Sequence, residues 1–269
     1  MKSKNVKTEK AKPPSLADRL DAFFFNVAEL ALFTGRFFKS FLKPPYEFSQ
    51  LMKQSFIVGN NSLSLVGVTA FIIGLVFTMQ SKPTLARFGA ESWLPAMIAV
   101  SMIREIVPVI TALICAGKVG SGIGAELASM RVTEQIDAME VAGAKPFHYL
   151  IVTRILSTTL MLPILVIFAD AIALFGSYVG VNIQGGNTSL VLFYTDAMHA
   201  VDYIDLLPAF IKTFFFGFAI GLVGCYQGYN SNSGTEGVGK SANSSVVIAS
   251  LLIFIIDLIA VQITTVFEK

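Results

Sequence analysis

Residues 245–267 read SVVIASLLIFIIDLIAVQITTVF, a run of 23 residues in which Asp257 is the only charged side chain. About 20 consecutive apolar residues in a helix are enough to cross the hydrocarbon core of a bilayer. Other long apolar stretches of the 269-residue chain have the same character, and together they predict five membrane-spanning helices. The other four predicted spans are residues 56–80, 93–116, 150–181 and 204–226.

The composition of the whole chain is typical of a membrane protein. Charged residues make up 14% of the sequence and hydrophobic residues 54%, with a mean hydropathy of +0.68, whereas a soluble domain carries about 25% charged residues. The lysine-rich residues 1–12 are not followed by the apolar run and cleavage site of a secretory signal peptide. Cys115 and Cys225 lie in apolar stretches without a CxxC neighbour, so we expect buried small side chains rather than a disulfide or a metal site. The fold class that we predict is an all-α integral membrane protein.

Composition divides the chain into three segments: a basic tail at 1–14, an amphipathic helix at 15–45 and a five-helix membrane domain at 46–269. We expect the tail to be disordered. In the second segment, apolar side chains recur every three or four positions from Leu16 to Phe41, and a Pro-Pro pair at 44–45 ends the helix. Such a helix is typical of the membrane interface rather than of a span. The alternative is an ordinary amphipathic packing helix.

Lys and Arg are unevenly distributed among the segments that connect the predicted spans. If the N-terminus is cytoplasmic, fourteen of them lie on the cytoplasmic side and three, Lys82, Arg87 and Lys269, lie on the opposite side. The connecting loop expected at 182–203 has none. Because cytoplasmic segments carry the excess of positive charge, the sequence predicts a cytoplasmic N-terminus. An odd number of spans then places the C-terminus on the outer side.

Glycines recur at a spacing that lets membrane helices approach each other closely. Three pairs are four residues apart: Gly120 and Gly124, Gly176 and Gly180, and Gly217 and Gly221. We interpret these pairs as signs of a compact helix bundle.

Charged side chains inside the predicted spans are the candidate functional residues. A charge at the centre of a membrane helix costs about 2.5–3.5 kcal/mol on insertion scales, so such residues face a bundle interior or a wet cavity and are often paired. Arg104 and Glu105 fall in the second span and Lys212 in the fourth. Our hypothesis is that Arg104 and Glu105 line or border a polar cavity with Lys212 as a counter-charge. The alternative is structural pairing between helices, which we favour for Asp170 and Asp257.

Residues 234–241, GTEGVGKS, match the pattern of a phosphate-binding P-loop, G-x-x-x-x-G-K-[ST]. A P-loop requires a buried strand before it and a helix after it that directs its N-terminus at phosphate. Here a predicted span precedes the segment and another follows it, and no α/β pattern exists in the chain. We therefore reject nucleotide binding and expect a flexible cytoplasmic hairpin.

Residues 131–141, RVTEQIDAMEV, form a short segment between the second and third spans that is compatible with a helix. Its apolar side chains Val132, Ile136 and Met139 fall on one side, and its acidic side chains fall on another. Gly143 ends it. A short amphipathic helix on the cytoplasmic face is what a membrane subunit needs to dock onto a soluble motor. The alternative is a plain surface helix.

Four blocks of the sequence are distinctive: REIVPVITALI at 104–114, AGKVGS at 116–121, AEL followed by MRVTEQIDAME within 125–140, and EGVGKS at 236–241. They resemble motifs of the MlaE-type permeases, the membrane subunits of MCE-associated ABC transporters. The resemblance extends from about residue 50 to the C-terminus. The departures from the family pattern are Val107 for Gly, Lys118 for Arg, Ser129 for Thr and Lys240 for Arg. The last of these creates the P-loop-like match, which supports its rejection.

The resemblance implies an assembly as well as a fold. Two permease copies are expected to pair with two cytoplasmic ABC ATPases, with a ring of MCE-domain proteins on the periplasmic side. The implied activity is movement of phospholipid between the inner and outer membranes of a bacterium, which maintains outer-membrane lipid asymmetry. This chain is then a non-catalytic inner-membrane subunit with a periplasmic C-terminus. No cofactor, metal or nucleic acid is expected, and ATP is bound by the partner.

The resemblance also assigns roles to particular residues. Arg104 and Glu105 match a charged pair near the lipid cavity, Lys212 matches a basic residue in the fourth span, and Phe88 falls where an aromatic side chain contacts lipid at the periplasmic mouth. The segment between the second and third spans matches the coupling helix that contacts the ATPase. Its expected contact residues are Arg131, Glu134, Gln135, Asp137 and Glu140.

Three other functions compete with this interpretation. The same fold can serve a permease for another hydrophobic solute, such as a sterol or a small apolar compound. A membrane-embedded enzyme would need a nucleophile, an acid–base pair or a metal cluster at one depth, and the sequence offers none. A scaffold without transport activity is the third alternative. The direction of transport and the lipid head group are not determined by the sequence.

Overall fold

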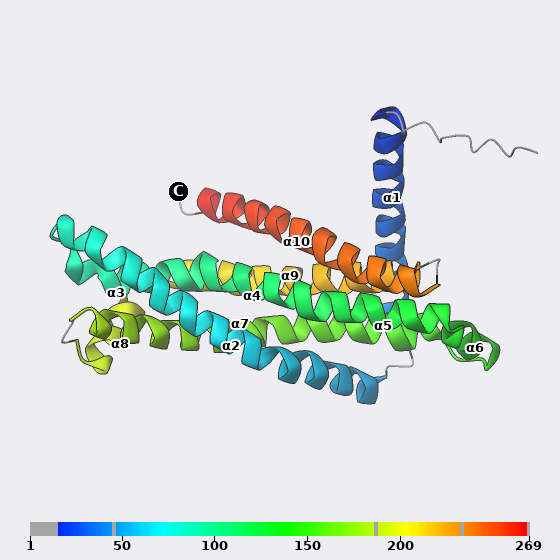
Figure 1. Cartoon of the computed structure of the whole chain (residues 1–269), viewed down its shortest axis with the longest axis horizontal. Helices are drawn as coiled ribbons and strands as arrows, with labels where there is room; N and C mark the ends of the chain where they lie inside the picture. Colours follow the sequence, from blue (N-terminus) through cyan, green and yellow to red (C-terminus); the bar gives the residue numbers. More distant parts are fainter. Residues whose placement is uncertain (1–15, 45–46, 186–187, 232–233, 268–269) are drawn as a thin grey trace, which may run out of the picture.

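A computed structural model describes residues 16–44, 47–185, 188–231 and 234–267 of the chain. Five of its helical segments are long and apolar enough to cross a membrane, and they run roughly along one direction in Figure 1. These segments are 27 to 42 residues long, so each is longer than a bilayer core requires and most extend beyond the predicted bounds. They are α2 (Phe48–Arg87), η1 to α5 (Glu91–Val132), η4 and α7 (Phe147–Ile183), α9 (Tyr203–Tyr229) and α10 (Gly234–Phe267). The prediction of five spanning helices is confirmed in number and order.

The second spanning segment contains two π-helical turns, which the sequence analysis did not predict. It consists of η1 (Glu91–Trp93), α3 (Leu94–Ser101), the π-helix η2 (Met102–Ile106), α4 (Val107–Cys115), the π-helix η3 (Ala116–Gly120) and α5 (Ser121–Val132). Pro108 lacks an N–H group, and in an α-helix its ring would crowd the carbonyl of Arg104 four residues earlier. A π-helical turn accommodates this conflict, and such turns are frequent at functional sites. η2 carries Arg104 and Glu105.

Glycines let the helices of the bundle pack backbone against backbone. A Cβ atom on Gly74 of α2 would collide with the carbonyl of Ala173 on α7, and one on Gly176 would collide with the carbonyl of Phe71. On α9, a Cβ on Gly217 would lie 2.5 Å from the carbonyl oxygen of Thr158. All three predicted glycine pairs lie at such helix–helix contacts, so the prediction of close packing is confirmed.

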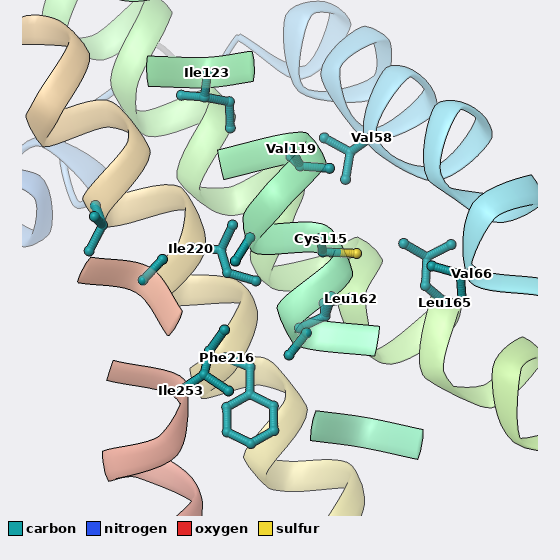
Figure 2. Close-up of a cluster of buried hydrophobic side chains, with 14 of the residues drawn as sticks. Val58, Val66, Cys115, Val119, Ile123, Leu162, Leu165, Phe216, Ile220 and Ile253 are labelled. Atoms are coloured by element: carbon teal, nitrogen blue, oxygen red, sulfur yellow. The ribbon is translucent and has the colours of Figure 1, made fainter. Parts of the chain in front are cut away.

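The apolar core lies where the second segment, α7 and α9 meet, with α2 and α10 on its outside. Figure 2 shows buried side chains that converge from all five segments, among them Val58, Cys115, Leu162, Phe216 and Ile253. Cys115 and Cys225 are buried free cysteines, as predicted. α10 is the least buried of the five segments: 11% of its most apolar stretch is buried, against 56% for α9. In Figure 1, α10 diverges from the other helices toward its C-terminal end. Its outer face therefore remains strongly apolar and exposed.

Helix α1 (Leu16–Phe41) runs across the direction of the bundle at the end where α5 finishes and α10 begins (Figure 1). It is anchored by Phe33 and Phe37, which are buried, and by a hydrogen bond of 2.9 Å from the Tyr226 hydroxyl to the Glu29 carboxylate. Its other side exposes apolar side chains such as Phe24, Phe25 and Leu32. The amphipathic helix is thus separate from the five spans, while its place in the membrane interface stays a prediction. The predicted tail 1–14 and the predicted first helical residue, Ser15, lie outside the described residues.

Three connections differ from expectation. The loop expected at 182–203 contains a helix, α8 (Leu190–His199), which Ser189 caps through its hydroxyl and which buries Phe193 and Ala197 in the bundle. The segment 234–241, expected to be a flexible hairpin, forms the first turns of α10. The helix expected at 131–141 is broken: α5 ends at Val132 and α6 (Gln135–Val141) begins after a turn. Glu134 in this turn has a left-handed backbone with φ of 57°, which a continuous α-helix does not contain.

Candidate functional site

Five charged side chains from three helical elements form one cluster, which we call the charged cluster. η2 supplies Arg104 and Glu105, α9 supplies Asp205 and Lys212, and α10 supplies Asp257. The Lys212 Nζ atom lies 2.6 Å from Glu105 Oε2 and 2.9 Å from Asp257 Oδ1. The Arg104 Nη1 atom lies 3.0 Å from Asp205 Oδ1. Lys212 is thus the counter-charge of Glu105, while Arg104 pairs with Asp205. The role of these residues at a lipid cavity stays a prediction.

Lys212 is the most deeply buried member of the charged cluster, with 4% of its side chain exposed. An unpaired ammonium at this depth would be strongly unfavourable, and two carboxylates offset that cost. Other members of the charged cluster are less buried, with 36% of the Glu105 side chain and 26% of the Arg104 side chain exposed. The cluster therefore has an inner ammonium and an outer edge at which a bound molecule can reach charged groups.

An apolar groove of about 750 Å³ lies between α9 and α10, directly beside the charged cluster. Lys212 is the only charged side chain among the residues that line it. The other lining residues are Tyr203, Ile204, Leu207, Pro208, Ile211, Phe215, Ile256, Ile259, Ala260, Ile263 and Thr264. A small recess lined by Arg104, Glu105 and Asp205 shares Lys212 with the groove. Apolar walls that end at a few charged groups suit a molecule with a hydrocarbon part and a polar part.

Asp205 and Asp257 are the members of the charged cluster that sequence reasoning undervalued. The sequence analysis does not include Asp205 among the candidate functional residues. Asp205 lies seven residues before Lys212 and hence on the same face of α9. It also takes part in the capping box of this helix together with Asp202. Asp257 was expected to have a structural role, and its ion pair with Lys212 is compatible with that role.

Phe88, expected at the periplasmic mouth, lies just after the end of α2, and 80% of it is exposed. It is not among the residues that line the groove or the recess. The structure thus does not bring Phe88 to the charged cluster, and its lipid contact stays a prediction.

The segment expected to be the coupling helix presents a charged surface at the end of α5. Arg131 Nη1 lies 2.5 Å from Asp137 Oδ1, which ties the end of α5 to α6. Ile136 is fully buried, whereas Glu134, Gln135 and Glu140 are exposed. The apolar side chain of Val141 is 91% exposed. The helix is shorter than expected, and Glu134 lies in the turn before it. The role of this segment in coupling stays a prediction.

The described part of the chain offers little basis for the other chemistries that the sequence analysis weighed. Residues 234–241 are helical, and no strand precedes them among the described residues, so the P-loop-like match lacks the geometry of a P-loop. Within the whole described part of the chain, no group of three or more His, Cys, Asp or Glu side chains is placed to hold a metal ion.

Comparison with known proteins gives consistent similarities over most of the chain. Residues 51–263, which include the whole charged cluster, match the family model described as Permease MlaE. A probable ABC transporter permease protein of Rickettsia typhi is 37% identical over 233 residues, which cover 87% of this chain and 90% of the relative. A second, from Pyropia yezoensis, is 39% identical over 78% of this chain and 80% of the relative. A third, from Synechocystis, is 31% identical over 88% and 89% respectively.

Proposed function

Because this chain belongs to the MlaE permease family, we propose that it moves phospholipid between the inner and outer membranes and so maintains outer-membrane lipid asymmetry. The chain is the permease subunit of an ABC transporter and a multi-pass membrane protein. Permeases of this kind are generally non-catalytic, and a cytoplasmic ATPase partner hydrolyses the ATP. Beyond this, we propose the lipid substrate, its site on this chain and the remaining partners.

The observation that carries the proposal is the juxtaposition of the apolar groove with the charged cluster. Acyl chains gain free energy from apolar walls at about 25 cal/mol per Å² of surface removed from water. A phosphate-bearing head group needs cationic hydrogen-bond donors at the end of those walls. Lys212 lines the groove and Arg104 lines the adjoining recess, 26% exposed. The arrangement therefore matches both ends of a phospholipid.

A second copy of the chain completes the site in this proposal. The groove is open, and the outer face of α10 beside it exposes large apolar side chains, including Leu251, Phe254 and Leu258. Exposed apolar area of this kind marks a lipid- or protein-facing surface. Two copies that face each other across α10 would enclose two grooves and two charged clusters in one cavity.

The ATPase docks, in this proposal, on the exposed side of α6. Glu134, Gln135 and Glu140 provide polar contacts, and Val141 provides an apolar contact that is 91% exposed. The salt bridge between Arg131 and Asp137 connects α6 to α5, so a movement of α6 is passed to the second spanning segment. That segment carries Arg104 and Glu105.

The charge distribution supports an orientation for the same assembly. The excess of Lys and Arg on the side of the N-terminus and α6 supports a cytoplasmic location for those parts of a protein of the bacterial inner membrane. The mouth of the groove near Tyr203 and Thr264 then faces the periplasm, where the proposed MCE-domain ring would receive lipid.

Replacement of Glu105 by Gln tests the function of the charged cluster. We expect the purified complex with Glu105→Gln to transfer labelled phospholipid between vesicles at least about tenfold more slowly, because Lys212 loses one of two carboxylate partners. The matched control is Glu91→Gln, an exposed residue of η1 outside the groove and the recess. Normal transfer by the Glu105→Gln complex at normal expression would remove Glu105 from the lipid site.

The alternative substrate is another hydrophobic solute, such as a sterol. The apolar lining of the groove favours it as much as it favours acyl chains, whereas the charged cluster favours a phospholipid. Mass spectrometry of lipids that copurify with the complex separates the two. A sterol in place of phospholipid would overturn the proposed substrate while leaving the permease family unchanged.

A further inference from the structure

Two adjoining cavities lie on another side of α9, between η2, α7 and α8. Their volumes are about 440 and 400 Å³. They share the lining residues Ile103, Ile167, Asp170, Tyr203 and Leu206, so Asp170 is common to both. We call them the lateral cavities. The charged cluster takes no part in their lining.

Asp170 is a carboxylate within a long apolar helix, and the charged cluster does not use it. Its Oδ1 atom is buried and has no hydrogen-bond partner, and among the described residues Asp170 forms no ion pair. A carboxyl group at this depth is costly unless something satisfies it. By contrast, the charged side chains Lys212, Glu105 and Asp257 form ion pairs with one another within the bundle. Asp170 therefore differs from them in being directed at a cavity without a protein counter-charge.

The polar and aromatic residues that line the lateral cavities are acidic residues and tyrosines, together with Phe210. Asp202 is the second charged residue in their lining, and the lining contains no Lys, Arg or His. Asp202 is exposed and takes part in the capping box of α9, whereas Asp170 has a buried Oδ1 atom without a hydrogen-bond partner. Tyr194 and Tyr203 also line the larger cavity. Carboxylates beside aromatic rings are the groups that recognise ammonium and quaternary ammonium ions.

We propose that the lateral cavities bind the positively charged amine end of an amphiphile, with Asp170 as the counter-charge and the apolar walls of α7 and α9 around its hydrocarbon part. The ligand class is an alkylammonium, either the amine of a zwitterionic lipid head group or a free single-chain amine. The acidic side chains Asp170 and Asp202, with no basic residue in the lining, make the site unfavourable for anionic amphiphiles. Tyr203 and Leu207 line both the groove and the lateral cavities, but the lateral cavities contain no member of the charged cluster. The proposal does not depend on the function proposed for the groove.

The test is native mass spectrometry of the purified full chain, with any subunits that copurify, in a non-ionic maltoside detergent. The probes are dodecyltrimethylammonium, dodecyl sulfate, phosphatidylcholine and phosphatidylglycerol. We expect dodecyltrimethylammonium to bind and Asp170→Asn to weaken this binding by at least about tenfold, since a charge-assisted contact in a desolvated site is lost. Asp196→Asn is the matched control, because Asp196 is on α8 but does not line the cavities.

A second variant keeps the test decisive if Asp170→Asn does not fold. Met198 lines the larger cavity, is half exposed and lies on α8, so Met198→Lys introduces a built-in ammonium with little cost to packing. We expect it to weaken binding of dodecyltrimethylammonium at least as much as Asp170→Asn does. Binding of phosphatidylcholine that depends on Asp170 identifies the lipid head group as the source, and binding of dodecyltrimethylammonium alone identifies a free amine. Equal binding of dodecyl sulfate or phosphatidylglycerol, or unchanged binding in both variants, would overturn the proposal.

Discussion

Replacement of Lys212 by Met removes the ammonium that holds Glu105 and Asp257 together, while it keeps a side chain of similar length. The two carboxylates are then left facing each other around the former position of the Nζ atom, which was 2.6 and 2.9 Å from them. Loss of one partner of a buried ion pair costs roughly 3–5 kcal/mol. Because 36% of Glu105 and 20% of Asp257 are exposed, water screens part of the repulsion. We expect a loss at the low end of that range, about 3 kcal/mol.

The same reasoning predicts that the triple variant Lys212→Met, Glu105→Gln, Asp257→Asn recovers most of the lost stability, since no uncompensated charge remains. Phospholipid transfer should stay low in both variants, because the triple variant also lacks the ammonium in the groove. Stability is measured by heating the detergent-solubilised protein and following the folded fraction by size-exclusion chromatography. A triple variant as unstable as the single one would show that Lys212 acts through packing. Full transfer by the triple variant would refute the assignment of the charged cluster to lipid binding.

Three further predictions concern α6, the α2–α7 contact and the turn before α6. Glu140→Lys reverses an exposed charge on α6, so we expect it to lower ATP-driven lipid transfer while thermal stability changes by no more than about 0.5 kcal/mol; unchanged transfer would count against docking through this surface. Gly176→Leu places a side chain against the Phe71 carbonyl and should destabilise the protein by about 3 kcal/mol or more, whereas Gly35→Leu, on α1 with open space around it, is the control. Glu134→Gly relieves a left-handed backbone at φ 57° and should stabilise the turn by about 1 kcal/mol. Slower amide hydrogen exchange in α6 is the expected readout for Glu134→Gly, and faster exchange would contradict it.

The sequence was sufficient to predict the five spans because each is a long apolar run, and membrane insertion depends directly on such runs. It also predicted the glycine contacts, since small residues are what allow helix backbones to approach. It did not predict α8, because its ten residues are too few for a span and it lies within the connection between two spans. The break at Glu134 was missed because nothing in the RVTEQIDAMEV pattern marks a left-handed residue; the turn is imposed by how α5 and α6 pack.

The charged cluster was only partly predictable for a different reason. A charge within an apolar run is visible in sequence, which is how Arg104, Glu105 and Lys212 were found. Which charges meet is decided by the packing of α9 between the second segment and α10. The directly paired side chains are as far as 107 positions apart in the sequence. Asp205 lies at the beginning of its helix, where an acidic residue is ordinarily explained by capping. Its second role, as the partner of Arg104, becomes visible only in three dimensions.

The two π-helical turns in the segment 91–132 have a consequence for how mutations in it are interpreted. Each π turn holds more residues than an α turn, and each residue of an α-helix rotates the side-chain direction by about 100°. The faces of α3, α4 and α5 are therefore out of phase with one another. A helical wheel drawn continuously from residue 94 to residue 132 would therefore place some inward-facing residues on the outer side of the helix and some outward-facing residues on the inner side. Scanning mutagenesis of this segment has to be plotted on three wheels, restarted at Val107 and at Ser121.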